Sequence, residues 1–293
     1  MQNNSRTTEP SSSSPRVALV TGTSSGIGLA VSIAAAGAGW TIVATLRDPE
    51  SAAPLSAAAA TAGVELDIQI LDVTRPETIT TVLGHIVSAY GRLDAVVNNA
   101  GAAALGTIEL MTMEQVRASM EVNFFGAVAV TRAAFPSLRR SAGRVITITS
   151  VGGAVGQPFN EAYCAAKFAL EGFMESLHPV AKTVGVAVTV IEPAAVTTDF
   201  VSNAGIKQIE LLAGAGPYRP ALTRSLDRTM RQFDPSVAQS ADEIAAVVVA
   251  ALSDTAPVFR QQTSPAARAL VGAKLADLDG TRITGLTSTW VSA

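Results

Sequence analysis

Short apolar runs rich in β-branched residues alternate with longer alanine-rich stretches from residue 16 to about residue 193. The short runs have the length of strands, and the longer stretches have the length of helices. Strands that alternate with helices form βαβ units around a mostly parallel sheet, and nearly continuous apolar strands indicate burial on both faces. We therefore predict a doubly wound α/β fold. The predicted strands are residues 17–20, 40–46, 65–71, 94–98, 144–149 and 186–191, and the predicted helices are residues 27–36, 76–90, 113–138 and 162–183.

The two ends of the chain depart from this pattern. Residues 1–15 are rich in Ser, Thr and Pro, so we predict a disordered tail and no signal peptide, ahead of one domain over 16–293. Residues 199–239 hold glycines, prolines and scattered charges with weak helical periodicity, which indicates a substrate-binding insertion. A buried helix is predicted over 241–252 with Ser240 as its N-cap. The last thirty residues give an ambiguous pattern.

Composition narrows the class of protein. Of the 293 residues, 48% are hydrophobic and 15% are charged, and the formal net charge is -3. These values exclude a chain that is disordered throughout, and the slight acidic excess argues against a nucleic-acid partner. The single cysteine, Cys164, cannot form an intramolecular disulfide, which favours a reducing compartment and a cytoplasmic protein.

One uncharged stretch raises the question of a membrane span. Residues 17–46 carry no charge, and these 30 residues are long enough on paper to cross a bilayer. However, residues 21–28 form a polar, glycine-rich break within the stretch. We therefore interpret it as a buried strand, loop, helix and strand of a soluble protein, and predict no membrane span.

Three glycines follow the first predicted strand, at positions 22, 26 and 28. Glycine allows the backbone to approach a pyrophosphate and lets a strand and a helix pack closely. The N-terminus of the next helix offers unpaired N–H groups and partial positive charge to the phosphates. A purely structural turn is the alternative, but the position between a strand and a helix favours a dinucleotide site.

The end of the second strand bears on which dinucleotide is bound. A carboxylate there would bind the ribose 2′-OH, whereas an arginine accommodates a 2′-phosphate. The strand ends at neutral Leu46, and Arg47 follows with a guanidinium suited to bidentate phosphate contact. We predict NADP(H) as the preferred cofactor, with NAD(H) as the alternative because Asp48 comes next. Both residues would otherwise be ordinary solvated loop charges.

A serine, a tyrosine and a lysine have the spacing of a catalytic set. Tyr163 and Lys167 lie four residues apart, on one face of a predicted helix, and Ser150 ends a strand whose carboxyl end lines the crevice. A tyrosine that acts as a base near pH 7 needs roughly 4 kcal/mol of phenolate stabilisation, which a desolvated lysine beside an oxidised nicotinamide could provide. Lys167 is the only lysine among the first 181 residues, although the chain has 21 basic residues, which favours a chemical role.

Together, residues 21–28 (TGTSSGIG), 98–101 (NNAG), Asn123, Ser150 and the Tyr163–Lys167 pair make residues 17–199 resemble the short-chain dehydrogenase/reductase family. The resemblance implies a Rossmann-like domain in which Ser150 polarises the substrate oxygen and Tyr163 is the general acid/base. It also implies that Lys167 lowers the pKa of Tyr163 and holds the ribose, while Asn123 anchors a water in a proton relay. The implied cofactor-binding residues are Gly22, Ser24, Ser25, Gly26, Ile27, Gly28, Arg47, Asp72, Val73, Asn98, Ala100, Gly101, Tyr163, Lys167, Pro193, Val196 and Thr198.

A narrower resemblance is carried by residues 44–48 (ATLRD), 150–153 (SVGG), 158–160 (PFN) and 163–172 (YCAAKFALEG). These segments are similar to the 17β-hydroxysteroid dehydrogenase type 1 branch and to its retinol-reducing relatives. In that branch the residues matching Ser25 and Arg47 hold the 2′-phosphate.

The resemblance has two departures. Many family members have Pro-Gly where this chain has Pro193 and Ala194, and the resemblance fades beyond Phe200. The substrate loop of the steroid enzyme uses a histidine, whereas His85 and His178 of this chain both lie upstream. Tyr218 is our candidate substitute for that histidine.

We therefore predict an NADP(H)-preferring oxidoreductase that interconverts a secondary alcohol and a ketone on a lipophilic substrate. A 17β-hydroxysteroid, such as the oestradiol/oestrone pair, is the first candidate. The alternatives are a reductase for retinoid, 3-oxoacyl or xenobiotic carbonyl substrates and, in another class, a non-catalytic dinucleotide-binding sensor. The predicted substrate-binding residues are Ser150, Gly152, Phe159, Asn160, Tyr163, Phe200 and Tyr218, with Leu211, Leu212 and Phe233 as further apolar lining.

Three further expectations complete the sequence-based picture. The two histidines have no metal-ligand spacing with other side chains, so we predict no metal site. Cys164 has no histidine placed to activate it and is expected to be a packed thiol. The helices over 113–138 and 162–183 form subunit interfaces in the resembled family, which implies a homodimer or homotetramer; burial in the monomer core is the alternative.

Overall fold

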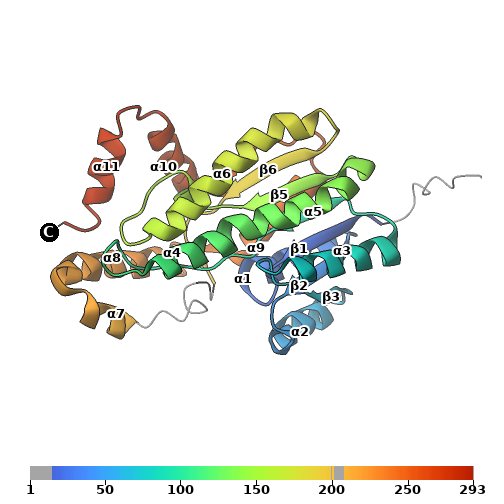
Figure 1. Cartoon of the computed structure of the whole chain (residues 1–293), viewed down its shortest axis with the longest axis horizontal. Helices are drawn as coiled ribbons and strands as arrows, with labels where there is room; N and C mark the ends of the chain where they lie inside the picture. Colours follow the sequence, from blue (N-terminus) through green and yellow to red (C-terminus); the bar gives the residue numbers. More distant parts are fainter. Residues whose placement is uncertain (1–14, 199, 201–207, 293) are drawn as a thin grey trace, which may run out of the picture.

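Seven parallel strands form the central sheet, in the order β3-β2-β1-β4-β5-β6-β9 (Figure 1). The computed structural model describes residues 15–198, 200 and 208–292. The order changes direction between β1 and β4, which are hydrogen-bonded neighbours although β2 and β3 separate them in sequence. Such a switch point opens a crevice at the carboxyl ends of the strands, where ligands bind. The bounds are β1 Val17–Thr21, β2 Thr41–Leu46, β3 Asp67–Ile70, β4 Ala95–Asn98, β5 Arg144–Ile148, β6 Ala187–Glu192 and β9 Arg260–Gln262.

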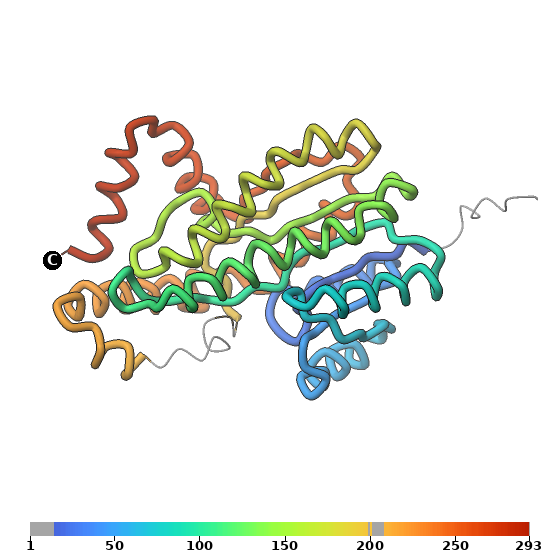
Figure 2. Tube along the Cα trace, viewed as in Figure 1, coloured from blue at the N-terminus to red at the C-terminus, as the bar shows by residue number. Residues whose placement is uncertain are grey.

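Helices cover both faces of this sheet, as the ribbon and the tube show (Figures 1 and 2). Successive side chains of a strand point to opposite faces, so β1 gives Val17 and Leu19 to one apolar core and Ala18 and Val20 to the other. Helices α3, α5 and α6 complete the first core, and α1, α2 and α9 complete the second. The bounds are α1 Gly26–Gly37, α2 Ala53–Ala62, α3 Pro76–Tyr90, α5 Gly126–Ser141, α6 Glu161–Lys182 and α9 Ala241–Ser253.

The structure confirms the doubly wound fold and the six predicted strands, with small changes at their ends. The predicted helices before β2, over 76–90, over 162–183 and over 241–252 are present as α1, α3, α6 and α9. The predicted cap of α9 is also present. Ser240 Oγ accepts a hydrogen bond from Glu243 N at 3.2 Å, and the Glu243 carboxylate accepts one from Ser240 N at 2.7 Å.

The predicted continuous α-helix over residues 113–138 is wrong. Helix α4, Met113–Met120, and helix α5 are separated by a π-helical turn, Glu121–Phe125. The extra residue of a π turn changes the direction of the side chains around it. Asn123, within the turn, is thereby directed to the backbone of Ala102. Apolar periodicity carries no signal for this turn, because residues on both sides of it still pack against the core.

The region after β6 is more regular than the sequence pattern indicates. Within 208–239, two α-helices form although the sequence shows only weak helical periodicity there, and the assignment of this region as a substrate-binding insertion stays a prediction. Two short strands, β7 and β8, pair at the base of this region, and two helices occupy the last part of the chain. The bounds are β7 Val196–Thr197, α7 Gln208–Gly214, α8 Arg219–Gln232, β8 Gln239–Ser240, α10 Pro265–Leu275 and α11 Thr281–Ser288.

Some expectations concern residues that the structure does not describe. The predicted disordered tail covers residues 1–15, of which 1–14 lie outside the described residues. Residues 199 and 201–207 of the predicted insertion also lie outside them. The uncharged stretch 17–46 folds as β1, α1 and β2, as predicted. Among the described residues, no helix combines the length and the apolar character that crossing a membrane requires.

A polar cluster ties α3 to β3, the strand at one end of the sheet order. Asp67, the first residue of β3, lies 2.6 Å from His85 Nε2 and accepts hydrogen bonds from Gln69 Nε2 at 2.6 Å and from Tyr90 Oη at 2.9 Å. Burial by itself would raise the pKa of Asp67, but the hydrogen bonds from Gln69, His85 and Tyr90 lower it below the ordinary value. The charged carboxylate therefore stabilises the fold.

Asp67→Asn should lower the free energy of unfolding by about 1–2 kcal/mol at pH 7, because it removes a charged acceptor of several hydrogen bonds. The folded-state pKa is lowered, so the contribution is present above the unfolded pKa of about 3.9 and is lost as the pH falls through the folded value. The difference between variant and wild type should therefore shrink below about pH 4. Urea titrations at pH 7 and pH 3 measure it. Glu65→Gln, at an exposed position, is the control, and an equal loss in that variant would contradict the assignment.

Candidate active site

The glycine loop between β1 and α1 is packed too closely to hold side chains. A Cβ on Gly28 would lie 2.2 Å from Gly22 O and 2.4 Å from Asn99 Nδ2. Gly22 has a φ of +71°, and a Cβ there would lie 2.8 Å from the Ala100 Cα. The loop therefore needs glycine at both positions, as the sequence indicated. A close turn between a strand and the N-terminus of a helix is the kind of site that fits a bound pyrophosphate.

Two neighbouring asparagines at the end of β4 have different roles. Asn99 Nδ2 donates to Thr21 O and Gly22 O, both at 2.9 Å, and so fastens the glycine loop to β4. Asn98 Nδ2 instead donates to Thr131 Oγ1 at 2.8 Å and to Thr147 Oγ1 at 3.3 Å, inside the protein. Sequence reasoning named Asn98 for the cofactor site and missed Asn99. The motif names both residues, but only the packing shows which side chain faces the loop.

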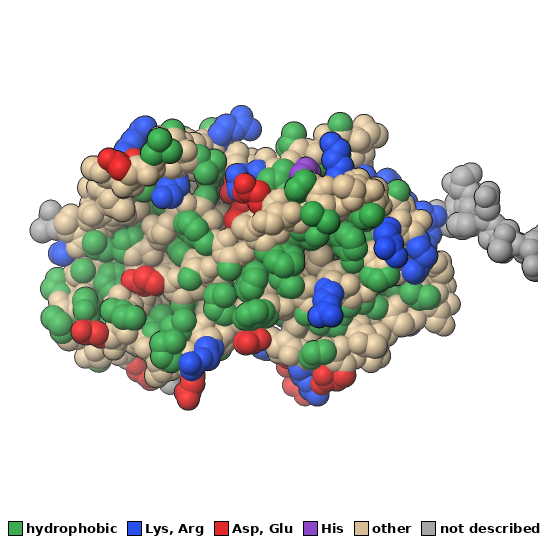
Figure 3. Space-filling model, turned by 45° about the horizontal axis from the view of Figure 1, so that its top comes forward, with side chains coloured by type: hydrophobic (Ala, Val, Ile, Leu, Met, Phe, Trp, Pro, Cys, Tyr) green, Lys and Arg blue, Asp and Glu red, His purple; other side chains and the backbone are tan. Residues whose placement is uncertain are grey.

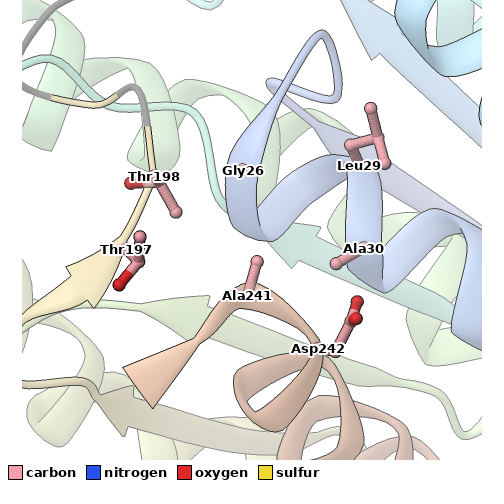
Figure 4. A pocket seen from close by; sticks show the side chains of 7 residues that line it. All are labelled: Gly26, Leu29, Ala30, Thr197, Thr198, Ala241 and Asp242. Atoms are coloured by element: carbon pink, nitrogen blue, oxygen red, sulfur yellow. The ribbon is translucent and has the colours of Figure 1, made fainter. Parts of the chain in front are cut away.

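A hollow of about 400 Å³ lies beside the first turn of α1 (Figure 4). Gly26 and Thr198, both predicted to bind the cofactor, line it together with residues of α1, β7 and the first turn of α9. A Cβ on Gly26 would lie 3.2 Å from the Thr198 side chain. Ser25 occupies the N-cap position of α1. The segment after β6 therefore meets the glycine loop, although Gly26 and Thr198 are 172 positions apart in the sequence. The hollow is lined by Gly26, Leu29, Ala30, Thr197, Thr198, Ala241 and Asp242.

The charges after β2 differ in what they contact. Asp48 Oδ1 accepts a hydrogen bond from Glu50 N at 3.0 Å and caps the short turn Pro49–Ala52. Arg47 is exposed, and no ion pair within the described part of the chain includes it. The carboxylate is thus held by local structure, whereas the guanidinium is available to an anion.

The predicted adenine-side residues lie after β3. Asp72 Oδ1 accepts hydrogen bonds from Thr74 N at 2.9 Å and from Thr74 Oγ1 at 2.7 Å, which fixes the turn. Val73 is buried and packs against Gly126, where a Cβ would lie 2.6 Å from its side chain. This turn therefore has a fixed shape at the carboxyl edge of the sheet.

Ser150 and Tyr163 meet at the end of β5. Ser150 Oγ accepts a hydrogen bond from Gly152 N at 3.0 Å, which forms a tight turn after the strand. The Ser150 hydroxyl and the Tyr163 ring both lie against Gly152, since a Cβ built there would be 3.3 Å from Ser150 Oγ and 3.4 Å from Tyr163 Cε1. Burial raises the pKa of Tyr163 above its ordinary value, and the nearby Ser150 hydroxyl opposes that rise. The protein alone therefore keeps the phenol protonated, and a further positive charge is needed to make it a base near neutral pH.

Lys167 is buried at the same edge of the sheet, with 4% of its surface exposed. Its ammonium donates to Ile148 O at 3.0 Å and lies 5.8 Å from the centroid of the Tyr163 ring. Burial lowers the pKa of Lys167 to about 8, while the negative charge of Glu171 acts in the opposite direction. The loop after β4 passes close to the lysine, and a Cβ on Gly101 would lie 3.8 Å from Lys167 Nζ but only 2.9 Å from Asn123 Oδ1, so glycine is needed there for the approach to Asn123.

Asn123 lies at the back of the site rather than free within it. Its Oδ1 accepts from Ala102 N at 3.1 Å, and its Nδ2 donates to Ala102 O and Ser119 O, both at 3.0 Å. The side chain thus holds the loop after β4 against the π turn. Its predicted part in a proton relay stays a prediction.

The predicted substrate-binding residues surround the start of α6. Phe159 has a φ of +62°, an uncommon conformation for phenylalanine, and its carbonyl accepts a hydrogen bond from Gly106 N at 2.9 Å. The Phe200 ring meets the Tyr163 ring edge-on, with centroids 5.8 Å apart. Asn160 precedes α6 at its N-cap position, and Gly152 is buried in the turn after Ser150. Apolar side chains of α7, α8 and the loop after β4 pack around Phe159, namely Leu105, Leu110, Leu211, Leu212, Ala215, Leu222 and Leu226.

The remaining candidates take other positions. The Tyr218 ring packs against the Phe159 cluster, and its hydroxyl faces the exposed carboxylate of Glu109, which raises the pKa of Tyr218. His178 Nδ1 lies 2.9 Å from Val188 O, and His85 belongs to the Asp67 cluster. Burial raises the pKa of the Cys164 thiol to about 11, as expected of a packed and unreactive thiol. Phe233 is half-buried at the end of α8.

Comparison with known proteins adds the family. Residues 16–208 match the family model described as short chain dehydrogenase. The chain belongs to the short-chain dehydrogenase family. Retinol dehydrogenase 8 of Bos taurus is 33% identical over 274 residues, which are 91% of this chain and 87% of that protein. The 17-beta-hydroxysteroid dehydrogenase type 1 of Mus musculus is 36% identical over 256 residues, which are 84% of this chain and 73% of that protein.

Solved structures agree with this membership. A short-chain dehydrogenase from Streptomyces avermitilis superposes with a TM-score of 0.75 and 30% identity, covering 95% of this chain and 97% of that one. Other solved structures of the same fold hold NAD or NADPH. This short-chain dehydrogenase is therefore an alcohol dehydrogenase or ketone reductase. The closely packed glycines between β1 and α1 fit a dinucleotide of the kind that those structures hold.

Gly28→Ala should weaken cofactor binding at least about tenfold, because its Cβ forces apart the loop that receives the pyrophosphate. Titration of NADPH fluorescence with the purified protein measures the dissociation constant. Gly37→Ala, at the other end of α1, is the matched control, because a Cβ there meets nothing within 4 Å. Equal affinities in the two variants would show that the glycine loop does not shape the cofactor site.

Proposed function

We propose that this short-chain dehydrogenase is an NADP(H)-preferring oxidoreductase that interconverts a secondary alcohol and a ketone on a lipophilic substrate. The observation that carries the proposal is the position of the Ser150–Tyr163 pair beside the apolar side chains around Phe159 and Phe200. A 17β-hydroxysteroid, such as the oestradiol/oestrone pair, is the first candidate substrate. The names of the steroid and retinol relatives support a lipophilic alcohol of this kind.

Each catalytic side chain would act on the substrate oxygen or on the proton that it exchanges. Ser150 donates a hydrogen bond and orients the oxygen, and Tyr163 passes a proton to it or accepts one from it. Lys167 supplies the positive charge that brings the pKa of Tyr163 toward neutrality when the site is closed to water. A bound nicotinamide supplies or accepts the hydride at the substrate carbon.

The apolar character of the cluster around Phe159 favours a large hydrophobic substrate over a small polar one. Side chains of α7 and α8 pack around Phe159, just before α6, and the Phe200 ring meets the Tyr163 ring, so a substrate that reaches Tyr163 would pass apolar groups. Burial of apolar surface contributes about 25 cal/mol per Å², and a rigid polycyclic ligand loses little conformational entropy on binding. Retinoid, 3-oxoacyl and xenobiotic carbonyl compounds are the competing substrates, since the same cluster would receive them.

Tyr163→Phe should lower the rate of turnover by at least about 100-fold while leaving the affinity for NADPH within a few-fold, because only the proton donor is removed. The measurement is nicotinamide fluorescence with oestradiol or oestrone, retinoids and 3-oxoacyl compounds as substrates. Tyr90→Phe, far from the site in the Asp67 cluster, is the control. Turnover of Tyr163→Phe at the wild-type rate would refute the catalytic assignment. A wild-type protein that binds NADPH and turns over none of these substrates would favour the sensor alternative.

The preference for NADP(H) depends on Arg47. Its exposed guanidinium follows β2, while the neighbouring Asp48 is occupied as a helix cap. An arginine that forms a bidentate contact with a phosphate gains charge-assisted hydrogen bonds that a ribose hydroxyl cannot provide.

Arg47→Ala should weaken NADP(H) binding by about tenfold or more and leave NAD(H) binding nearly unchanged. Parallel titrations with the two reduced cofactors measure the ratio of affinities. Arg139→Ala, an exposed arginine in the last turn of α5, serves as the control for loss of surface charge. A wild-type protein that binds both cofactors equally would overturn the NADP(H) preference, and a parallel loss for both would mean that Arg47 does not read the 2′-phosphate.

The subunit arrangement and the location are also proposed. Apolar side chains remain exposed along α4, the π turn and α6, and hydrophobic groups are spread over this side of the molecule in Figure 3. A monomer leaves few such patches, whereas self-association would cover them. This exposure supports a homodimer or homotetramer through α4, α5 and α6, and the single buried cysteine suits a cytoplasmic location. The exposed side chains are Met113, Phe125, Phe168, Phe173 and Val180.

A further inference from the structure

Charged side chains are buried between α6, β6 and β9, one helical turn beyond Lys167. The Glu171 and Glu192 side chains are 6% and 0% exposed, and Arg260 lies between them. Arg260 Nη2 is 3.2 Å from Glu171 Oε2, and Arg260 Nε is 3.3 Å from Glu192 Oε1. Gln262 Nε2 donates to Glu192 Oε2 at 2.5 Å. We refer to Glu171, Glu192 and Arg260 as the Arg260 charge cluster.

Stability alone does not explain these charges. Removing two carboxylates from water costs several kcal/mol each, and well-packed apolar residues at such positions are often as stable or more so. Glu192 shows the cost directly, because its Oε1 forms no hydrogen bond in the described part of the chain and meets Arg260 only as an ion pair. The charges are therefore candidates for a role in the chemistry nearby.

The Arg260 charge cluster is connected to the active site through α6. Glu171 follows Lys167 by four residues on the same helix, so the two side chains lie on one face. Glu171 is also the residue whose negative charge opposes the effect of burial on the ammonium of Lys167.

A second connection passes through the strand that ends at Ser150. Thr149 Oγ1 donates to Glu171 Oε1 at 2.5 Å. In the turn after Ser150, a Cβ on Gly153 would lie 2.9 Å from Glu171 Cγ and 3.2 Å from Lys167 O. The Glu171 side chain is thus enclosed by the same two elements, β5 and α6, that present Ser150 and Lys167.

We propose that Glu171, Glu192 and Arg260 are positioning residues that keep Lys167 charged and directed at the carboxyl edge of β5. Glu171 acts on the ammonium directly by its charge and its place on α6. Arg260 holds Glu171 in place through their ion pair. The positive charge of Arg260 also competes with Lys167 for the negative charge of Glu171, and Glu192 reduces this competition because it pairs with Arg260 as well. The inference rests on the proposed function, because it assigns these residues to the catalytic lysine of the oxidoreductase.

Glu192 gives the arrangement a dependence on pH. Burial raises the pKa of Glu192 to about 7, the charge of Glu171 acts in the same direction, and Gln262 and Arg260 oppose it. The charged groups that face Glu192 are Glu171 on α6 and Arg260 on β9, while its neighbour Gln262 is neutral. When Glu192 takes up a proton, Arg260 acts more fully on Glu171, and less of the Glu171 charge remains for Lys167. The support for Lys167 therefore weakens as the pH falls below neutrality.

The scarcity of lysine makes a direct test practical. The chain has only four lysines, at positions 167, 182, 207 and 274. Protein labelled with ¹³C at lysine Cε should give four resolved signals, and Lys167→Arg assigns the signal of interest by its loss. The pH at the midpoint of that signal reports protonation of Lys167 in the protein without substrate or cofactor, so it does not depend on turnover.

Glu171→Gln should lower the titration midpoint of Lys167 by about one pH unit or more, because a nearby negative charge is lost. Glu192→Gln should shift it in the same direction by a smaller amount. Glu175→Gln is the matched control: Glu175 also meets Arg260, at 3.0 Å, but its side chain is 61% exposed, so no shift is expected. Glu171→Asp, which keeps the charge, should restore most of the wild-type midpoint.

A purely structural role predicts a different result. Glu171→Gln would then lower the free energy of unfolding and leave the midpoint of Lys167 at its wild-type value, and that outcome overturns the proposal. If Glu171→Gln does not fold, the isosteric Glu192→Gln decides: an unchanged midpoint in that variant overturns the proposal equally.

Activity provides the link to the proposed function. With oestradiol and NADP⁺ as the probe, the rise in oxidation rate with pH should move to higher pH in Glu171→Gln, since a less charged Lys167 leaves the Tyr163 phenolate less stable. If the wild type turns over no substrate, the proposed function fails, yet the lysine signals still test the positioning. If the wild type is active and neither the midpoint nor the pH profile moves, the positioning role fails and the proposed function stands.

Discussion

The site is organised around an ammonium group held out of water at the carboxyl edge of a parallel sheet. Lys167 donates to the carbonyl of Ile148, and the surroundings that lower its pKa to about 8 are those that make it effective beside Tyr163. A charge in such a place is costly, and it persists only where other groups over-determine it. The loop at Gly101, which the Asn123 side chain anchors to the π turn, passes beside this lysine, and Glu171 acts on it from the next turn of α6.

The proposed dinucleotide site depends on segments whose backbones lie close together. The glycine loop touches β4 through Asn99, and the segment after β6 reaches the loop through Thr198. Three segments far apart in the sequence therefore enclose the start of α1, and the switch point of the sheet brings them together. The dinucleotide site and the catalytic site share one edge because parallel strands all end there.

The region after β6 joins the substrate side to the sheet. Helices α7 and α8 pack around Phe159, while β9 closes the sheet beside β6 and carries Arg260 and Gln262 into the interior. A second arginine contact holds the residues after α11 against α8: the Arg228 guanidinium carbon lies 3.5 Å from the centroid of the Trp290 ring. The chain after β6, which does not follow the strand–helix alternation, thus supplies apolar side chains near Phe159 and the charge of Arg260 beside Glu171.

The sequence by itself determined the elements whose signal is local. Strands buried on both faces require continuous apolar runs, a close strand–helix turn requires glycine, and the spacing of Tyr163 and Lys167 places them on one helical face, so these could be predicted. The tertiary structure alone decided β9, whose residues Arg260, Gln261 and Gln262 carry no apolar pattern and become a strand by pairing with β6. It likewise decided that Asn99 rather than Asn98 holds the glycine loop, and that Glu171 and Glu192 meet across Arg260. These contacts join residues up to 89 positions apart, and a polar residue's partner depends on which elements the fold brings beside it rather than on its neighbours in sequence.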